Sequence, residues 1–232
     1  MAYEHYVKLF NLTWTKPKYH EDPRLPRIPL EQHIDLIMAN SPLKLRTAIS
    51  LSKETGLRPV ELMRATLREI DLTQKTIYPR TAKHGSARVL SFSNRTLSLL
   101  NEYILRYNVN TNETLFGTWN SNTYGKWFRH YRNKTAKKMQ DPIIKTIRLY
   151  DLRHFFATML YKRTNNLLLV KMKLGHRRID TTLIYTQLIN FGEEEYSCEI
   201  ATDKQEAKKL IESGFEYTLT TPDGYMLFRK RK

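Results

Sequence analysis

The sequence is poor in cysteine and contains no long apolar segment. Its 232 residues include one cysteine, Cys198, so no internal disulfide can form, which fits a reducing compartment. No apolar run approaches the roughly 20 residues that a membrane-spanning helix needs. The N-terminal stretch carries Glu4, His5 and Lys8 and lacks the continuous apolar core of a secretory signal. These absences predict a soluble, cytoplasmic protein.

Patterns for metal and nucleotide chemistry are missing as well. The chain has no His/Cys cluster at zinc spacing, no carboxylate cluster like that of two-metal nucleases, and no G-x-x-x-x-G-K-[ST] loop. We therefore expect no metal and no cofactor.

Basic residues are abundant and unevenly placed. Lys and Arg number 39 against 23 Asp and Glu, a formal net charge of +16. Residues 126–178 hold fifteen Lys/Arg and two acids, whereas residues 190–216 hold eight acids and three lysines. A merely basic protein, or one that meets anionic lipid, would also carry a positive charge. The segregation favours a nucleic-acid face, because neutralised phosphates release condensed counterions.

Apolar spacing and turn residues predict a mainly α fold with a small antiparallel β-sheet. Four of the nine prolines lie between Pro17 and Pro29, which indicates a linker after residues 1–15, a short helix or an extended arm. A β-hairpin over 76–78 and 87–90 would turn at Gly85. Helices are expected over 30–38, 43–55, 60–66, 96–106, 124–138, 151–162, 167–174 and 181–188, followed by a tail with a helix over 204–213 and a hairpin over 215–220 and 225–228.

Two of four notable motifs lie in the first half of the chain. Thr55-Gly-Leu-Arg-Pro-Val-Glu-Leu62 places Arg58 and Glu61 three apart on one helical face, and Lys83 lies in the turn of the predicted hairpin. Taken singly, the Arg58–Glu61 pair is an ordinary surface ion pair, and Lys83 is an ordinary lysine.

The other two motifs follow the basic region. Tyr150-Asp-Leu-Arg-His154 opens a helix with Arg153 and His154, and Leu174-Gly-His176 is followed nine positions later by Tyr185. A tyrosine in an apolar Leu-Ile-Tyr-Thr context is more often a core residue than a catalytic one.

The order and spacing of the four motifs resemble the catalytic domain of tyrosine recombinases, the phage-integrase and Xer-like family. The resemblance runs from about Pro29 to Ile189. It implies the tyrosine recombinase catalytic-domain fold and a site-specific recombinase that cleaves and rejoins DNA through a 3′-phosphotyrosine intermediate. We expect residues 1–29 to form an arm or linker, 30–189 the catalytic domain, and 190–232 a C-terminal tail.

The resemblance also implies a role for each motif residue. Arg58 and Arg153 would clamp the scissile phosphate, which suits planar, permanently charged guanidinium groups. Tyr185 would attack the phosphorus. Further roles are implied for four residues: Lys83 as general acid, His154 in proton transfer or phosphate binding, His176 as a hydrogen-bond donor to a non-bridging oxygen, and Glu61 in orienting Arg58.

Tyr150 departs from the family pattern, which commonly has His or Lys at this position. A neutral phenol donates one hydrogen bond but brings no positive charge at neutral pH. Y-D-L-R-H resembles variants among archaeal integrases. Tyr150 is also a rival nucleophile, but Tyr185 is preferred because it alone has the expected spacing from His176.

DNA contacts are expected mainly from the basic segment before the third motif. A solvated helical face is the alternative for each residue. The preferred contacts are Lys126, Arg129 and Arg132, with Arg148, Arg177 and Arg178 as further phosphate contacts. By resemblance, the partner is double-stranded DNA and the working assembly a DNA-bound, nucleoid-associated tetramer.

Full-length family members usually carry an N-terminal helical domain, so this chain is expected to be either a catalytic fragment, which we favour, or a naturally short enzyme. Its tail could exchange between protomers or fold back in cis. Two other functions remain open: a non-catalytic DNA-binding regulator of the same fold, and relaxation of DNA in the manner of a type IB topoisomerase.

Overall fold

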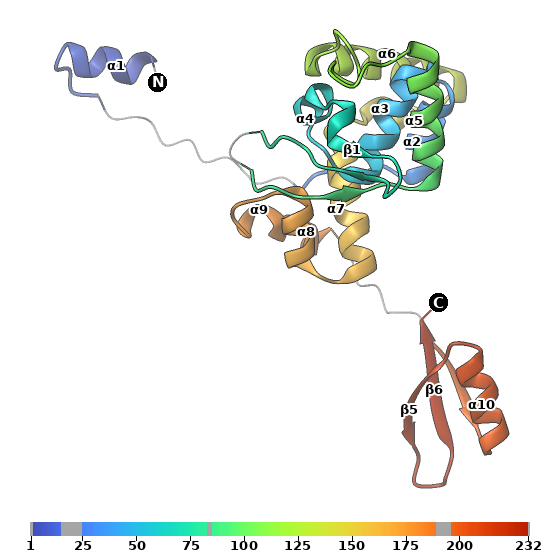
Figure 1. Cartoon of the computed structure of the whole chain (residues 1–232). Helices are drawn as coiled ribbons and strands as arrows, with labels where there is room; N and C mark the ends of the chain where they lie inside the picture. Colours follow the sequence, from blue (N-terminus) through green and yellow to red (C-terminus); the bar gives the residue numbers. More distant parts are fainter. Residues whose placement is uncertain (1, 15–24, 83–84, 189–195, 232) are drawn as a thin grey trace. The chain divides into compact units, whose positions relative to one another are not determined.

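The computed structural model describes residues 2–14, 25–82, 85–188 and 196–231 (Figure 1). The chain divides into two compact units, Met1–Tyr185 and Thr186–Lys232. The described helices are α1 (Ala2–Leu9), α2 (Glu31–Ala39), α3 (Leu43–Thr55), α4 (Pro59–Arg64), α5 (Asn94–Tyr107), α6 (Ser121–Met139), α7 (Asp151–Thr164), α8 (Leu167–Leu174), α9 (Asp180–Gln187) and α10 (Lys204–Glu212). The described strands are β1 (Ile70–Asp71), β2 (Thr76–Ile77), β3 (Leu90–Ser91), β4 (Tyr196–Ala201), β5 (Glu216–Thr220) and β6 (Met226–Arg231). The predicted fold class, mainly α with a small antiparallel β component, is confirmed.

Helix α3 lies at the centre of the larger unit and contacts α2, α4, α5, α6 and α7 (Figure 1). Nine of its thirteen residues are buried, so it has apolar residues on several faces rather than one stripe. Its buried hydroxyls find partners: Ser50 bonds Thr96 at 2.7 Å and Ser52 bonds the Tyr124 hydroxyl at 3.0 Å. These bonds satisfy polar groups that would otherwise destabilise the core.

Helix α3 ends at Gly56, which has a left-handed φ of 61°. A Cβ at this position would also overlap the ring of Phe156 on α7. Both constraints act just before Arg58. The glycine therefore allows the chain to turn into α4 while α7 packs against the turn.

Replacing Gly56 by alanine is expected to destabilise the larger unit by about 2–4 kcal/mol, from backbone strain plus overpacking. The matched control is Gly117→Ala, which has a similar φ of 60° but no built Cβ contact closer than 3.9 Å, to the Lys44 Nζ. Urea unfolding should show a clearly smaller loss for the control. Equal losses would mean that the Phe156 contact is unimportant.

A three-stranded antiparallel sheet of order β1-β2-β3 carries Ile70, Ile77 and Leu90 in register. All three side chains are buried. The prediction of a strand over 87–90 was wrong in its bounds, because β3 begins only at Leu90. The preceding residues make other contacts: Arg88 pairs with Glu61, and the Val89 carbonyl accepts from the Lys173 Nζ at 2.9 Å.

The smaller unit contains β4, α10, β5 and β6, with an antiparallel sheet of order β4-β6-β5. Strand β4 was not predicted, whereas the tail has a helix and a hairpin near the expected positions. Helix α10 contacts β4 and β5, and Ala201 and Phe228 are buried. In residues 1–15, of which 2–14 are described, the structure has the helix α1 rather than an extended arm. No described helix is both long and apolar enough to cross a bilayer.

Candidate active site

A pocket of 400 Å³ gathers residues from three of the four motifs. It is lined by Arg58, Gly85, Tyr150, His154, Gly175, His176, Arg177, Arg178, Thr181, Ile184 and Tyr185. Lys83, which represents the remaining motif, lies outside the described residues. The pocket thus brings together segments that are more than 120 positions apart in the sequence.

Arg58 precedes helix α4 and reaches the pocket beside the buried carboxylate of Glu61. Its Nη1 donates to Glu61 Oε1 at 2.9 Å, and its backbone N donates to Oε2 at 3.0 Å. Burial opposes ionisation of Glu61, but hydrogen bonds from Arg88, Arg58 and Ala82 outweigh it and hold the pKa of this carboxyl below its usual value. Glu61 is therefore an ionised acceptor that fixes the direction of Arg58.

Arg153 lies beneath the pocket rather than on its surface, with 2% of the residue exposed. Its Nη1 and Nη2 each donate at 2.6 Å to a backbone carbonyl, of Gly56 and Leu174 respectively. Burial, then the nearby Arg58, lower the pKa of Arg153 to about 10, so it remains a cation at neutral pH. Its guanidinium joins the end of α3 to the end of α8, and only its buried Nε lacks a partner among the described residues.

Tyr185 on α9 lies against His154 on α7. The Tyr185 hydroxyl and His154 Nδ1 are 3.1 Å apart, a hydrogen bond in which the phenol donates when His154 carries its proton on Nε2. Burial raises the pKa of Tyr185 to about 12, although Arg153 acts in the opposite direction. Burial also lowers the pKa of His154 below its ordinary value, so at neutral pH this imidazole is a neutral acceptor.

His176 lies just beyond Gly175, the left-handed residue that ends α8. Its Nδ1 is 3.0 Å from the Thr182 hydroxyl, which sets the orientation of the ring. Burial, then the positive charges of Arg153 and Arg58, lower the pKa of His176 to about 4. The neutral ring therefore presents its second nitrogen near the pocket without adding charge.

Tyr150 is 44% exposed and its ring meets that of His154 edge to face, with centroids 5.2 Å apart. It lines the pocket, and its hydroxyl makes no hydrogen bond to Tyr185. The two tyrosines therefore differ in burial: Tyr185 is buried and Tyr150 is accessible.

The sequence reasoning missed Arg88, whose side chain is 3% exposed and whose Nη2 donates to Glu61 Oε2 at 2.6 Å. A signal was present, since an arginine interrupts the β-prone run Ala87-Arg-Val-Leu90. It also missed Asp151, a buried carboxylate that accepts from the backbone and side chain of Arg148.

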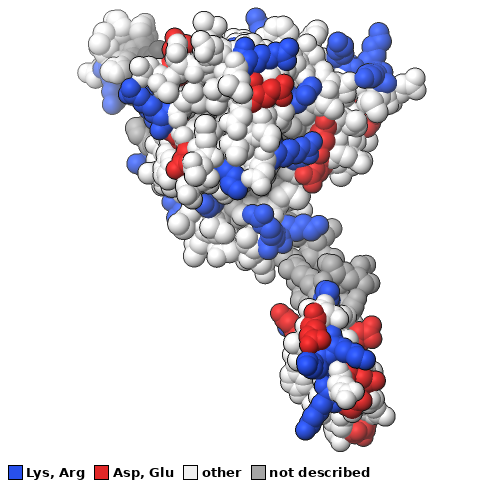
Figure 2. Space-filling model, turned by 45° about the vertical axis from the view of Figure 1, so that its right-hand side comes forward, with Lys and Arg blue, Asp and Glu red and all other residues white. Residues whose placement is uncertain are grey.

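The six expected DNA-contact residues differ in how free their side chains are. Arg132 donates to the Ile147 carbonyl at 2.7 Å and to Asn133, which occupies much of its guanidinium. Arg148 pairs with Asp151 and Arg178 with Asp180, although both arginines remain largely exposed. The other three, Lys126, Arg129 and Arg177, are exposed and form no hydrogen bond or ion pair with the part of the chain that the structure describes. In the view of Figure 2, basic side chains on the larger unit are interspersed with acidic ones.

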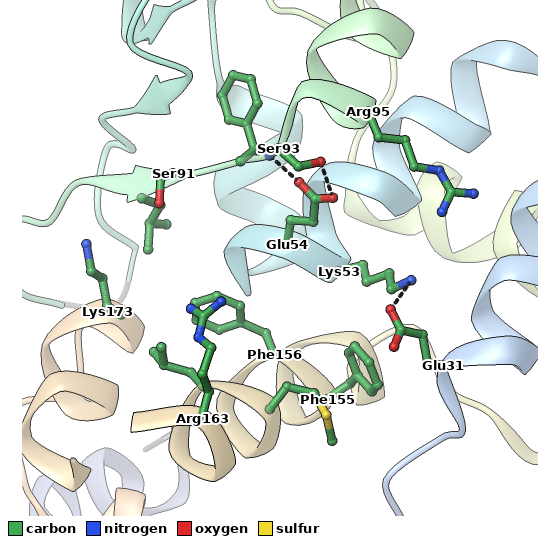
Figure 3. A pocket seen from close by; sticks show the side chains of 14 residues that line it. Glu31, Lys53, Glu54, Ser91, Ser93, Arg95, Phe155, Phe156, Arg163 and Lys173 are labelled. Atoms are coloured by element: carbon green, nitrogen blue, oxygen red, sulfur yellow. Dashed lines mark hydrogen bonds and ion pairs between the residues drawn. The ribbon is translucent and has the colours of Figure 1, made fainter. Parts of the chain in front are cut away.

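A second pocket, of 570 Å³, is lined by residues of α2, α3, β3, α5, α7 and α8 and contains none of the predicted site residues. Figure 3 shows Glu54 bonded to Ser93, whose backbone N and hydroxyl both donate at 2.7 Å. Lys53 is likewise paired with Glu31 at 2.9 Å. These polar groups hold the surrounding elements together. Among the described residues, no group of three or more His, Cys, Asp or Glu side chains is placed to hold a metal ion.

Comparison with known proteins places this arrangement in a family. The profile of the phage integrase family matches residues 29–190. The chain belongs to the phage integrase family. The resemblance stated from the motifs is therefore confirmed, and the family match covers the elements that build the pocket.

Curated relatives of this family member are named tyrosine recombinases. It is 33% identical over 146 residues to tyrosine recombinase XerA of Saccharolobus solfataricus, covering 63% of this chain and 46% of the relative. It is 28% identical over 179 residues to tyrosine recombinase XerD of Ralstonia nicotianae, covering 72% of this chain and 58% of the relative. The chain thus spans about half the length of these relatives.

Solved structures show the same fold. A crystal structure of XerA recombinase matches with a TM-score of 0.62 at 20% identity, covering 91% of this chain and 73% of the other. A lambda integrase dimer bound to a COC′ core site matches with a TM-score of 0.61 at 15% identity, covering 83% and 71%. The tyrosine recombinase catalytic-domain fold is therefore confirmed.

Proposed function

We propose that this chain cleaves and rejoins double-stranded DNA as a site-specific recombinase, with Tyr185 as the nucleophile. The observation that carries the proposal is the position of the Tyr185 hydroxyl, 3.1 Å from His154 Nδ1 in a pocket shared with Arg58 and His176. The names of its relatives as tyrosine recombinases support it.

In the proposed cleavage step, the Tyr185 oxygen forms a bond to phosphorus while the bond from phosphorus to the 5′-oxygen breaks. The phenolic proton passes to neutral His154, and the products are a 3′-phosphotyrosine and a free 5′-hydroxyl. Because the pKa of Tyr185 is about 12 and that of His154 is lowered, transfer before attack is uphill. We therefore infer that the proton moves during attack. Rejoining reverses these steps, and no ATP is needed because the phosphotyrosine bond conserves the cleaved bond's energy.

The phosphate would lie against Arg58, whose fixed guanidinium stabilises charge that develops on the non-bridging oxygens. Neutral His176 would donate a hydrogen bond from Nε2, since its Nδ1 faces Thr182. Arg153 would stabilise the phosphate mainly through its positive charge, which lies beneath the pocket. Its Nε would be the atom that donates a hydrogen bond to the phosphate.

Two further roles follow from the family resemblance. Lys83 is proposed as the general acid that protonates the departing 5′-oxygen. Tyr150 is proposed to donate a hydrogen bond to the phosphate, where the family more often has a cationic or titratable side chain. Because a phenol is no base at neutral pH, we assign activation of the nucleophile to His154 rather than to Tyr150.

DNA binding outside the pocket is proposed for Lys126, Arg129 and Arg177, which are exposed and unpaired among the described residues. Arg148 and Arg178 would exchange an acidic neighbour for a phosphate, and Arg132 would serve mainly to hold α6. From the family resemblance we propose that the working assembly is a tetramer on DNA.

His154→Asn is expected to lower the single-turnover cleavage rate by about 10²–10⁴-fold, the usual contribution of a general base. In the wild type, the rate should be flat near pH 7 and fall only at a pH lower than the ordinary pKa of histidine, because burial lowers the pKa of His154. The variant should lose that acidic limb. A rate that keeps the same pH profile in His154→Asn would assign the base to another group.

The proposed function is tested by trapping a covalent adduct on nicked duplexes, because diffusion of the short leaving strand prevents rejoining. A library of labelled duplexes, without added metal, should give an SDS-resistant complex with the protein on the 3′-phosphate end of the cleaved strand, and a 5′-hydroxyl that polynucleotide kinase can label. Attachment at the 5′ end, or clear DNA binding without any adduct, would contradict the proposal.

A further inference from the structure

Arg88 is a buried cation next to the pocket that the proposed mechanism does not use. It lies between the expected turn at Gly85 and strand β3, and its side chain is 3% exposed. Burying a guanidinium is costly unless a carboxylate compensates it. The compensating group is Glu61, whose Oε2 accepts from Arg88 Nη2 at 2.6 Å.

The two oxygens of Glu61 are divided between two arginine side chains. Oε1 accepts from Arg58 Nη1 at 2.9 Å and from the backbone N of Ala82 at 3.2 Å. Oε2 accepts from Arg88 Nη2 and from the backbone N of Arg58 at 3.0 Å. Arg88 therefore occupies the oxygen that the Arg58 side chain does not use. Without it, the carboxylate would be free to pair with Arg58 through both oxygens and neutralise it more fully.

Arg88 also packs beneath the turn that carries His176. A Cβ built on Gly175 would lie 2.9 Å from Arg88 Nη1 and 3.2 Å from its Cδ. The Nε and Nη1 of Arg88 are buried and have no partner among the described residues. One side chain thus touches the first motif through Glu61 and the last motif through Gly175.

The local charges do not cancel. Arg58, Arg88 and Arg153 are three cations, and Glu61 is the carboxylate that the first two share. After burial, the charges of Arg58 and Arg88 are further causes that lower the pKa of Arg153, which indicates that the three guanidinium groups interact. This surplus favours a dianionic transition state over a neutral or singly charged ligand.

We propose that Arg88 is a positioning residue for DNA cleavage, which holds Arg58 towards the phosphate through Glu61 and adds positive charge beneath the pocket. This inference rests on the proposed function. It assigns a role to a side chain that does not reach the pocket surface, so it predicts a loss of rate without a comparable loss of DNA affinity.

The test compares Arg88→Met, Arg88→Lys and Arg46→Met at saturating DNA under single-turnover conditions. Arg46 is a matched control, a partly buried arginine that donates to the carbonyls of Met38 and Ser41 away from the pocket. Arg88→Met is expected to cleave about 10–100-fold more slowly, the scale for partners that orient active-site groups, with DNA Kd within about threefold by the same reasoning. Arg88→Lys should recover part of the rate because it keeps the charge. Arg46→Met should cleave normally.

A neutral scissile group separates an electrostatic role from a merely structural one. Once trapping has identified the cleaved phosphodiester, a methylphosphonate replaces it, which removes one negative oxygen. The deficit of Arg88→Met should shrink on this substrate. An equal deficit on both substrates, or wild-type cleavage by Arg88→Met, would overturn the proposal.

A readout without cleavage keeps this inference distinct from the proposed function. Inorganic phosphate should raise the Tm of the wild type and of Arg46→Met, and raise it less in Arg88→Met and Arg88→Lys. If the wild type fails to cleave but this difference is found, the recombinase proposal fails and the role of Arg88 in building an anion site stands. Equal stabilisation of all four proteins would overturn the role of Arg88.

Discussion

Tyr185→Phe is expected to bind DNA with wild-type affinity and to form no covalent adduct. Removal of the nucleophile leaves no oxygen to attack, so the loss should be at least about 10⁴-fold, comparable to the loss of other catalytic nucleophiles. Affinity should hold because Tyr185 is 2% exposed and carries no charge at neutral pH. An electrophoretic shift and SDS-resistant trapping on the same nicked duplex measure the two properties together.

Tyr150→Phe is the companion variant, since it removes the accessible phenol of the same pocket. It should still form the adduct, with a rate reduced by about tenfold or less for the loss of one neutral hydrogen bond. An adduct that persists in Tyr185→Phe and vanishes in Tyr150→Phe would reverse the assignment. The same pair separates the alternative functions: a DNA-binding regulator would be unaffected by Tyr185→Phe, whereas a topoisomerase-like enzyme would lose relaxation of supercoiled DNA with it.

Arg58→Met is expected to lower the single-turnover cleavage rate by about 10²–10³-fold, the range for removal of one preorganised donor to a developing oxyanion. The fold should survive, because Glu61 keeps its ion pair with Arg88. Arg58→Lys should recover little of the rate, as an ammonium lacks the planar fork that donates to both Glu61 and a phosphate oxygen.

Thermal unfolding and DNA affinity of the two Arg58 variants should be measured beside their cleavage rates. Arg46→Met is the control for loss of a partly buried arginine. If Arg58→Met cleaves within about threefold of the wild type, a difference too small for a lost transition-state contact, Arg58 does not bind the reacting phosphate. A loss of DNA affinity as large as the loss of rate would place Arg58 in ground-state binding instead.

The sequence was sufficient for the features that depend on local spacing. Apolar periodicity located the main helices, and the helices predicted to end at residues 55 and 174 do so because Gly56 and Gly175 follow with a left-handed φ. The order of four short motifs then indicated the family, which in turn implied that residues far apart in the chain share one pocket. The pocket does contain Arg58, His154, His176 and Tyr185.

The polar partners that lie far apart in the sequence could not be predicted from local spacing. Arg153 donates to carbonyls of Gly56 and Leu174, 97 and 21 positions away, so its burial under the pocket depends on how α3 and α8 end. Arg88 turns inward instead of extending the predicted strand because Glu61 is within reach. Arg132 is held by the carbonyl of Ile147. In each case a long, flexible cationic side chain could reach several acceptors. The acceptor that it binds is determined by which segments the assembled fold brings close.

The measurement that bears most directly on the central claim is peptide mapping of the trapped adduct. The wild-type protein would be cross-linked to its own cleaved strand, digested with protease and nuclease, and the peptide that retains a nucleotide identified by mass spectrometry. We predict that the modified residue is Tyr185, joined through its oxygen to a 3′-phosphate. A nucleotide on Tyr150 or on any other residue would contradict the account.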